Sequence, residues 1–133
     1  AKLCTGDFVV TKHSNLSHVH VVFHMVVEQG TTRSMDGILS GLRNILSVAA
    51  QYDICKLTIP VFFVQPEFKH LYSTQILISR AEETIKSLRQ FLIQNSRIEI
   101  PLRTIQLIHP MYSNQFERVR ELLKTTFNKN PVM

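Results

Sequence analysis

Three histidines lie at positions 18, 20 and 24 of a strongly apolar stretch, and imidazole is a common zinc ligand. His18 and His20 are two residues apart, so on a β-strand both project to the same side. A third ligand would be needed to hold the ion, and the sequence does not place one. The favoured interpretation is therefore a polar or partly buried strand face under a helix, with hydrogen-bonded imidazoles, and zinc binding by His18 and His20 is the less favoured alternative.

A polar run directly before this stretch is the other candidate for ligand contact. His13, Ser14 and Asn15 can form a loop that touches a small molecule. Ser and Asn also favour turns, because their side chains hydrogen-bond to the nearby backbone. A simple turn is the favoured interpretation, and neither a cofactor nor a small-molecule ligand is expected.

The motifs of the common enzyme classes are missing. The sequence has no G-x-S-x-G elbow, no P-loop and no G-x-G-x-x-G fingerprint. Cys4 and Cys55 stand outside any recognisable nucleophile motif, and Glu82 and Glu83 fall on the expected solvated face of a helix. We therefore predict no catalytic residues and a domain that is not an enzyme.

The charge balance is basic, with 15 Lys and Arg against 10 Asp and Glu and a net charge of +5. Nucleic-acid binding would require these cations on one face with aromatic residues between them, and the tyrosines are not interleaved with them. We expect a solvated surface, with Arg118, Arg120 and Lys124 as a surface for protein partners and RNA as an alternative partner. The cations expected on this surface are Arg80, Lys86, Arg89, Arg97, Arg103, Arg118, Arg120 and Lys124.

The bulk properties fit a single cytoplasmic domain. A chain of 133 residues with 44% hydrophobic residues can bury one core. No apolar run approaches the roughly 20 residues that a membrane span needs, no signal peptide is visible, and two cysteines are typical of reduced thiols in the cytosol. Because the chain starts at Ala1, we favour a module of a longer chain.

The periodicities predict seven elements that position these residues. Alternating apolar residues indicate strands at 8–10 and 18–27, with odd positions apolar in the second, and apolar runs indicate strands at 55–64 and 103–109. Apolar residues at three- and four-residue steps predict helices over 34–51, 73–95 and 113–127. Pro60 marks a strand end, an edge or a bulge, and Gly37 and Gly41 allow a neighbour to approach one side of the first helix closely. Alternating strands and helices predict a single α/β domain over 1–133 with a mostly parallel sheet flanked by helices.

Two resemblances refine this interpretation. The segments VHVVFHMVV, GILSGLRNILSVAAQYD and CKLTIPVFF resemble the second half of a macro domain, and RAEETIKSLRQFL, RTIQLIHP and FERVRELL continue the pattern. This resemblance implies a three-layer, macro-domain-like fold and, as an alternative function, binding or hydrolysis of an ADP-ribose-like nucleotide near the Pro60 strand. The sequence departs from that pattern because VFFVQPEF, after Pro60, contains no glycine for a phosphate-binding loop.

The second resemblance covers roughly Gly6 to Leu123. The segments KHSNLSHVHVVFH, GLRNIL, LTIPVFF and RAEETIKSLRQF are similar to the C-terminal region of a eukaryotic family that includes a subunit of the FERRY complex. That complex is an early-endosomal Rab effector that links endosomes to messenger RNA. The resemblance implies a non-catalytic binding or scaffolding module of a complex subunit. Its partners would be protein subunits, its location would be the cytoplasm in association with endosomes, and it would form the C-terminal module of a longer chain.

Overall fold

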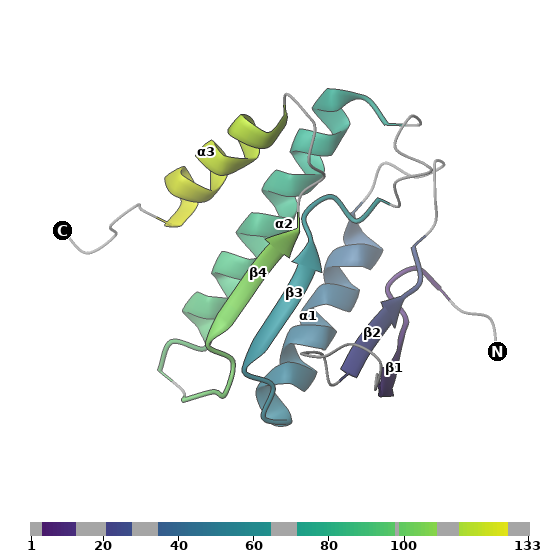
Figure 1. The fold of residues 1–133 in the computed structure, drawn as a ribbon, viewed down its shortest axis with the longest axis vertical. Helices are drawn as coiled ribbons and strands as arrows, with labels where there is room; N and C mark the ends of the chain where they lie inside the picture. The colour runs from purple at the N-terminus through teal and green to yellow at the C-terminus, as the bar shows by residue number, and fades with distance from the viewer. Residues whose placement is uncertain are drawn as a thin grey trace.

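The computed structural model describes residues 4–12, 21–27, 35–64, 72–97, 99–108 and 115–127. Within them the element order is β-β-α-β-α-β-α, as the sequence predicts, and the bounds agree with the predicted ones to within a few residues (Figure 1). The elements are β1 Phe8–Lys12, β2 Val21–Met25, α1 Asp36–Gln51, β3 Lys56–Pro60, α2 Thr74–Gln94, β4 Thr104–Ile108 and α3 Gln115–Phe127.

The first two strands form an antiparallel pair in which Phe8 lies opposite Met25 and Lys12 lies opposite Val21. The rings of Phe8 and Phe23 meet edge to face, with their centroids 5.6 Å apart. Both side chains pack against the main core, which fits the predicted apolar face of odd-numbered residues on β2. The alternation also predicts that the other face is mixed, and among its described residues His24 is exposed whereas Val22 and Val26 are partly buried.

The turn before β1 packs directly on α1, through the two glycines that the sequence singles out. Gly6 has a φ of +99°, which residues with a Cβ rarely adopt. A Cβ on Gly41 would overlap the carbonyl oxygen of Gly6 and would lie 2.8 Å from its Cα, and a Cβ on Gly37 would lie 2.9 Å from the carbonyl oxygen of Thr5. The predicted close approach at Gly37 and Gly41 is therefore confirmed.

Strands β3 and β4 pair in parallel, with Lys56 opposite Thr104 and Pro60 opposite Ile108. In β3 the buried residues alternate with exposed ones, and β4 shows the same alternation with partly buried residues. Pro60 is the last residue of β3, so the prediction that it marks the end of a strand is confirmed.

Two apolar clusters hold the helices against β3 and β4. The first joins α1 to β3 and to the second half of α2, and its buried members include Leu42, Leu46, Ile59 and Phe91. The second joins the first half of α2 to the segment after β3 and to α3, and it contains Val119. Ser73 caps α2 by accepting a hydrogen bond from the backbone N–H of Ile76.

The α/β class is confirmed, whereas the three-layer macro-domain-like arrangement is not. The described strands form two sheets of two strands, one antiparallel and one parallel, instead of one mostly parallel sheet. Leu57, Ile59, Ile105 and Leu107 turn toward the helices, whereas the alternate residues of both strands are exposed. Within the described residues, the helices therefore cover one face of the β3–β4 sheet.

Candidate functional site

The candidate ligand and metal residues from the sequence lie between β1 and β2 in the chain. His13, Ser14, Asn15, His18 and His20 lie outside the described residues, so the loop and zinc hypotheses stay predictions. In the described ranges, no three His, Cys, Asp or Glu side chains are grouped so as to hold a metal ion. The nearby His24 ring is exposed, and its Nε2 lies 2.8 Å from the hydroxyl of Thr11 across the β1–β2 pair.

The carboxylates Glu82 and Glu83 lie on α2 as predicted. Lys86 Nζ is 2.8 Å from Glu82 Oε1, an ion pair between residues at i and i+4. The hydrogen bond from Lys86 to Glu82 raises the pKa of the lysine. Both partners lie on the solvent side of the helix, where an ion pair of this kind stabilises the helix without making a reactive site.

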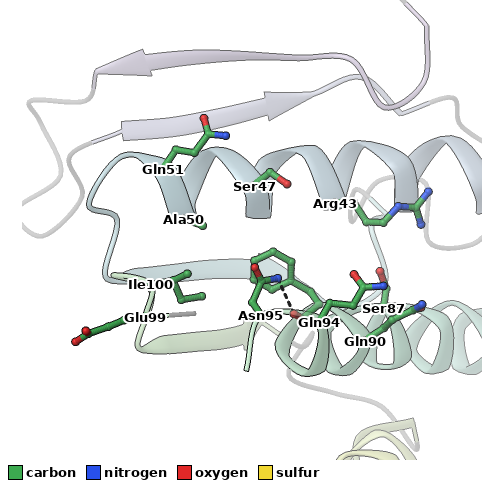
Figure 2. Close-up of a pocket in the computed structure, with 11 residues that line it drawn as sticks. Arg43, Ser47, Ala50, Gln51, Ser87, Gln90, Gln94, Asn95, Glu99 and Ile100 are labelled. Carbon is green, nitrogen blue, oxygen red and sulfur yellow. Dashed lines mark hydrogen bonds between the residues drawn. The ribbon is translucent and has the colours of Figure 1, made fainter. Parts of the chain in front are cut away.

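A cleft between α1 and α2 has a volume of about 620 Å³ and is rich in amides (Figure 2). Its apolar lining residues are Ala50, Phe91 and Ile100, and its polar lining residues are Arg43, Ser47, Gln51, Ser87, Gln90, Gln94, Asn95 and Glu99. Asn95 Nδ2 donates a 2.8 Å hydrogen bond to the carbonyl oxygen of Phe91, so this amide caps a backbone carbonyl at the C-terminal end of α2.

A second hollow differs from the first in its chemistry. This groove has a volume of about 280 Å³ and lies between β4 and the helices α2 and α3. We call it the β4 groove, and its lining residues are Leu88, Leu92, Leu102, Arg103, Ile105, Leu107, Leu123 and Phe127. Leu92 is 39% exposed and Phe127 is 41% exposed, so apolar surface here is open to contact by another molecule.

The predicted partner residues of α3 divide between two sides of the helix. All three, Arg118, Arg120 and Lys124, are exposed, in agreement with the prediction of a solvated surface. At 3.6 residues per turn, Arg120 and Lys124 fall beside the stripe formed by Leu123 and Phe127, which lines the β4 groove. Arg118 falls on roughly the opposite side of α3. Only two of the three cations therefore flank the groove.

Arg80 occupies an environment that the sequence analysis missed. The expectation that it lies on the solvated surface is wrong, because only 1% of the residue is exposed. Its Nη1 donates to the carbonyl oxygens of Phe62 and Phe63 at 3.3 and 3.2 Å, and its guanidinium lies over the ring of Tyr72, 4.7 Å from the centroid. Nε and Nη2 of Arg80 and the hydroxyl of the buried Thr84 meet no hydrogen-bond partner in the described part of the chain.

This cluster holds the exit of β3 against α2. Phe63 adopts a φ of +54°, a conformation that costs energy for a residue with a Cβ. The two hydrogen bonds from Arg80 hold the backbone at that point, and the contact with Tyr72 joins it to the residue before the cap of α2. Desolvation lowers the pKa of the Arg80 guanidinium, and Tyr72 and Glu83 partly offset this effect. The group stays protonated, so its role here is to position the backbone.

The spacing of α2 contains the signal that would have revealed the burial of Arg80. The residue lies three positions after Leu77 and four before Thr84, and both are buried on the helix face that packs against the core. The charge of Arg80 led the interpretation toward solvent, whereas its position on the helix pointed toward the core. An arginine can be buried at such a position because its guanidinium can donate several hydrogen bonds to carbonyl oxygens.

Comparison with known proteins gives one consistent family. A family model described as "Ferry endosomal RAB5 effector complex subunit 3" matches residues 1–131. The human and rat proteins named FERRY endosomal RAB5 effector complex subunit 3 are each 33% identical over 110 residues, which covers 79% of this chain and 20% of theirs. The chain therefore spans about one fifth of the length of the curated relatives it matches. None of the helices in the described ranges has the length and apolar character to cross a membrane.

Proposed function

This chain belongs to the FERRY endosomal RAB5 effector complex subunit 3 family, and from that membership we propose that it is a non-catalytic module that binds protein partners in such a complex. The observation that carries the proposal is the β4 groove. Its lining is predominantly apolar and remains open to solvent, although a chain of this size can bury such side chains in its own core.

The composition of the groove favours a polypeptide over a small ligand. Small-molecule sites place a few convergent polar groups within an enclosed apolar pocket. The β4 groove offers Arg103 as its one charged lining residue, at the rim, and it continues onto exposed apolar surface at Leu92 and Phe127. A surface that combines apolar anchors with a charged rim is typical of protein interfaces.

The charge at the rim favours an acidic partner surface. Arg103 lines the groove, and Arg120 and Lys124 flank it on α3. Lys124 makes no ion pair with any described residue, so its charge is available to a partner. Complementary charge of this kind speeds association and sets the orientation of the bound partner.

Two finer assignments belong to the same proposal. The module would reach early endosomes through its complex, and any contribution to messenger RNA transport would come through that assembly. A macro-domain-like layering would place the β3–α2–β4 unit inside a larger sheet, which the parallel pairing of β3 and β4 supports. If the layering is macro-domain-like, binding of an ADP-ribose-like nucleotide is the alternative function.

The test is reconstitution with the other purified subunits of a FERRY complex, followed by size-exclusion chromatography. We expect the chain to co-elute with at least one subunit, Lys124→Glu to weaken this association, and Arg118→Glu to leave it unchanged. Arg118 is a matched control because it is an exposed cation on the same helix but faces away from the groove. Failure of the unmodified chain to associate with any subunit, or RNA binding that survives Lys124→Glu while protein binding is absent, would contradict the proposal.

A further inference from the structure

The backbone of β4 has one edge that β3 does not use. The N–H of Thr104 donates to the carbonyl oxygen of Cys55 at 3.1 Å, and the carbonyl oxygen of Ile108 accepts from Val61 at 3.0 Å. Residues that bond to a neighbouring strand alternate along a strand, so positions 104, 106 and 108 face β3. The N–H and C=O groups of Ile105 and Leu107 therefore point away from β3, and no described residue hydrogen-bonds to them on that side.

Apolar side chains form a floor beyond this edge. Helices α2 and α3 extend past β4 on the side away from β3 (Figure 1). Leu88 and Leu92 of α2 and Leu123 and Phe127 of α3 line the β4 groove together with residues of β4 itself. A strand placed next to β4 would rest the side chains of one face on this floor, as Leu57 and Ile59 of β3 rest on the helices. Its backbone would pair with the outward groups of Ile105 and Leu107.

The other face of the sheet determines what the alternate residues of such a strand would be. The outward side chains of β3 and β4 are exposed, and those of Thr58, Thr104 and Gln106 are polar. A strand added beside them would turn its alternate side chains to solvent. Its sequence would therefore alternate apolar residues with polar or charged ones.

Charge decides between an acidic segment and a second copy of this chain. The ion pairs of Arg103 with Glu99, at 3.7 Å, and of Arg120 with Glu117, at 4.0 Å, are long and exposed. Arg120 therefore stays available to an incoming anion, and so does the Nη2 side of Arg103, whose Nη1 donates a 2.9 Å hydrogen bond to the carbonyl oxygen of Ile100. Two copies joined at their β4 edges would bring these cations and Lys124 together, in a chain whose net charge is +5. Like charges in an interface disfavour the pairing of two copies, whereas acidic residues in a partner segment would be attracted to these cations.

We infer that the outer edge of β4 accepts an added β-strand from a partner protein, an extended segment about five residues long in which apolar residues alternate with acidic ones. The inference rests on the partner-binding function proposed above and names the form of the bound partner. Addition of a strand would satisfy the open backbone groups of an edge that proteins rarely leave exposed.

Amide hydrogen exchange, followed residue by residue by NMR, tests the inference on the whole chain. The probe is a short fluorescein-labelled peptide in which Asp and Glu alternate with Val and Ile. We expect the peptide to slow exchange at the amides of Ile105 and Leu107 by at least about tenfold. The amides of Lys56 and Thr58 are the internal control, because they point to the opposite edge of the sheet and should keep their rates.

Peptide controls isolate strand addition from charge attraction. A peptide of the same composition with its apolar residues grouped together should bind at least about tenfold more weakly, since it cannot alternate between floor and solvent. Three outcomes would overturn the inference: protection of Ile105 and Leu107 before any peptide is added, protection that appears elsewhere on the chain, or equal binding of both peptides. Self-association that protects the same two amides would overturn it in favour of a second copy.

Different outcomes contradict the proposed function and the inference of strand addition. If the chain co-elutes with FERRY subunits while the amides of Ile105 and Leu107 keep their exchange rates in the complex, partner binding stands and strand addition is wrong. If the peptide protects these amides but no subunit associates, the edge binds strands and the proposed assembly is wrong.

Discussion

Leu92 and Ile93 are neighbours on α2 that allow a matched test of the β4 groove. Leu92 lines the groove and is 39% exposed, whereas Ile93 is 53% exposed and is not among the groove residues. We predict that Leu92→Glu weakens binding to a protein partner strongly and that Ile93→Glu does not. Both changes put the same charge into the same turn of helix, so the comparison isolates the position of the side chain.

The size of the effect follows from the exposed fraction. Full burial of a leucine side chain contributes about 1.5–3 kcal/mol, so a partner that covers the exposed 39% of Leu92 gains about 0.6–1.2 kcal/mol. Burying an unsatisfied polar group in its place costs about 1–3 kcal/mol more. The predicted loss for Leu92→Glu is therefore about 2–4 kcal/mol, at least roughly thirtyfold in Kd.

The assay is titration of each variant with the isolated subunit that co-elutes with the chain, by calorimetry or fluorescence anisotropy. Urea unfolding of both variants serves as the control for folding. We expect their free energies of unfolding to agree within about 1 kcal/mol, because both residues are partly buried at the same end of α2. Equal loss of affinity in the two variants, or a loss in Ile93→Glu alone, would refute the assignment of the β4 groove as the binding surface.

Three further predictions concern the packing and the charge. Gly41→Ala should lower the free energy of unfolding by up to about 2 kcal/mol, because overpacking against Gly6 outweighs the gain in helix propensity of about 1 kcal/mol; in urea unfolding, the exposed Ser40→Ala should not be destabilising. Arg80→Ala should lower the free energy of unfolding by about 2–5 kcal/mol through a cavity and the loss of two hydrogen bonds to backbone carbonyl oxygens, and a cost as small as that of the exposed Arg43→Ala would contradict the positioning role of Arg80. The affinity for the partner subunit should fall as the salt concentration rises in the binding titration described above, since the cations at the groove rim are exposed. An affinity independent of salt would contradict a role for these cations in binding.

The sequence predicts the local elements well because each carries its own periodic signal. Apolar residues at alternate positions indicate β2, and residues at three- and four-residue steps indicate α1 and α2. Pro60 is the last residue of β3, which is one of the three positions that its sequence context predicts. The pairing of strands is a different matter. The antiparallel β1–β2 pair depends on how distant segments meet, and no short-range pattern specifies it.

The candidate site was less predictable for the same reason. The β4 groove joins Leu92, Ile105 and Phe127, which lie far apart in the sequence and come together only through packing. The sequence predicts Arg118, Arg120 and Lys124 together as a partner surface, because the side of α3 that faces β4 depends on packing.

Site-specific cross-linking in a reconstituted FERRY complex tests the central claim most directly. A photoreactive phenylalanine analogue would replace Phe127, at the β4 groove, or Tyr52, which is 69% exposed at the end of α1. The account predicts that the probe at Phe127 cross-links to another subunit and that the probe at Tyr52 does not. A complex that forms without any cross-link from position 127, or with equal cross-linking from both positions, would contradict it.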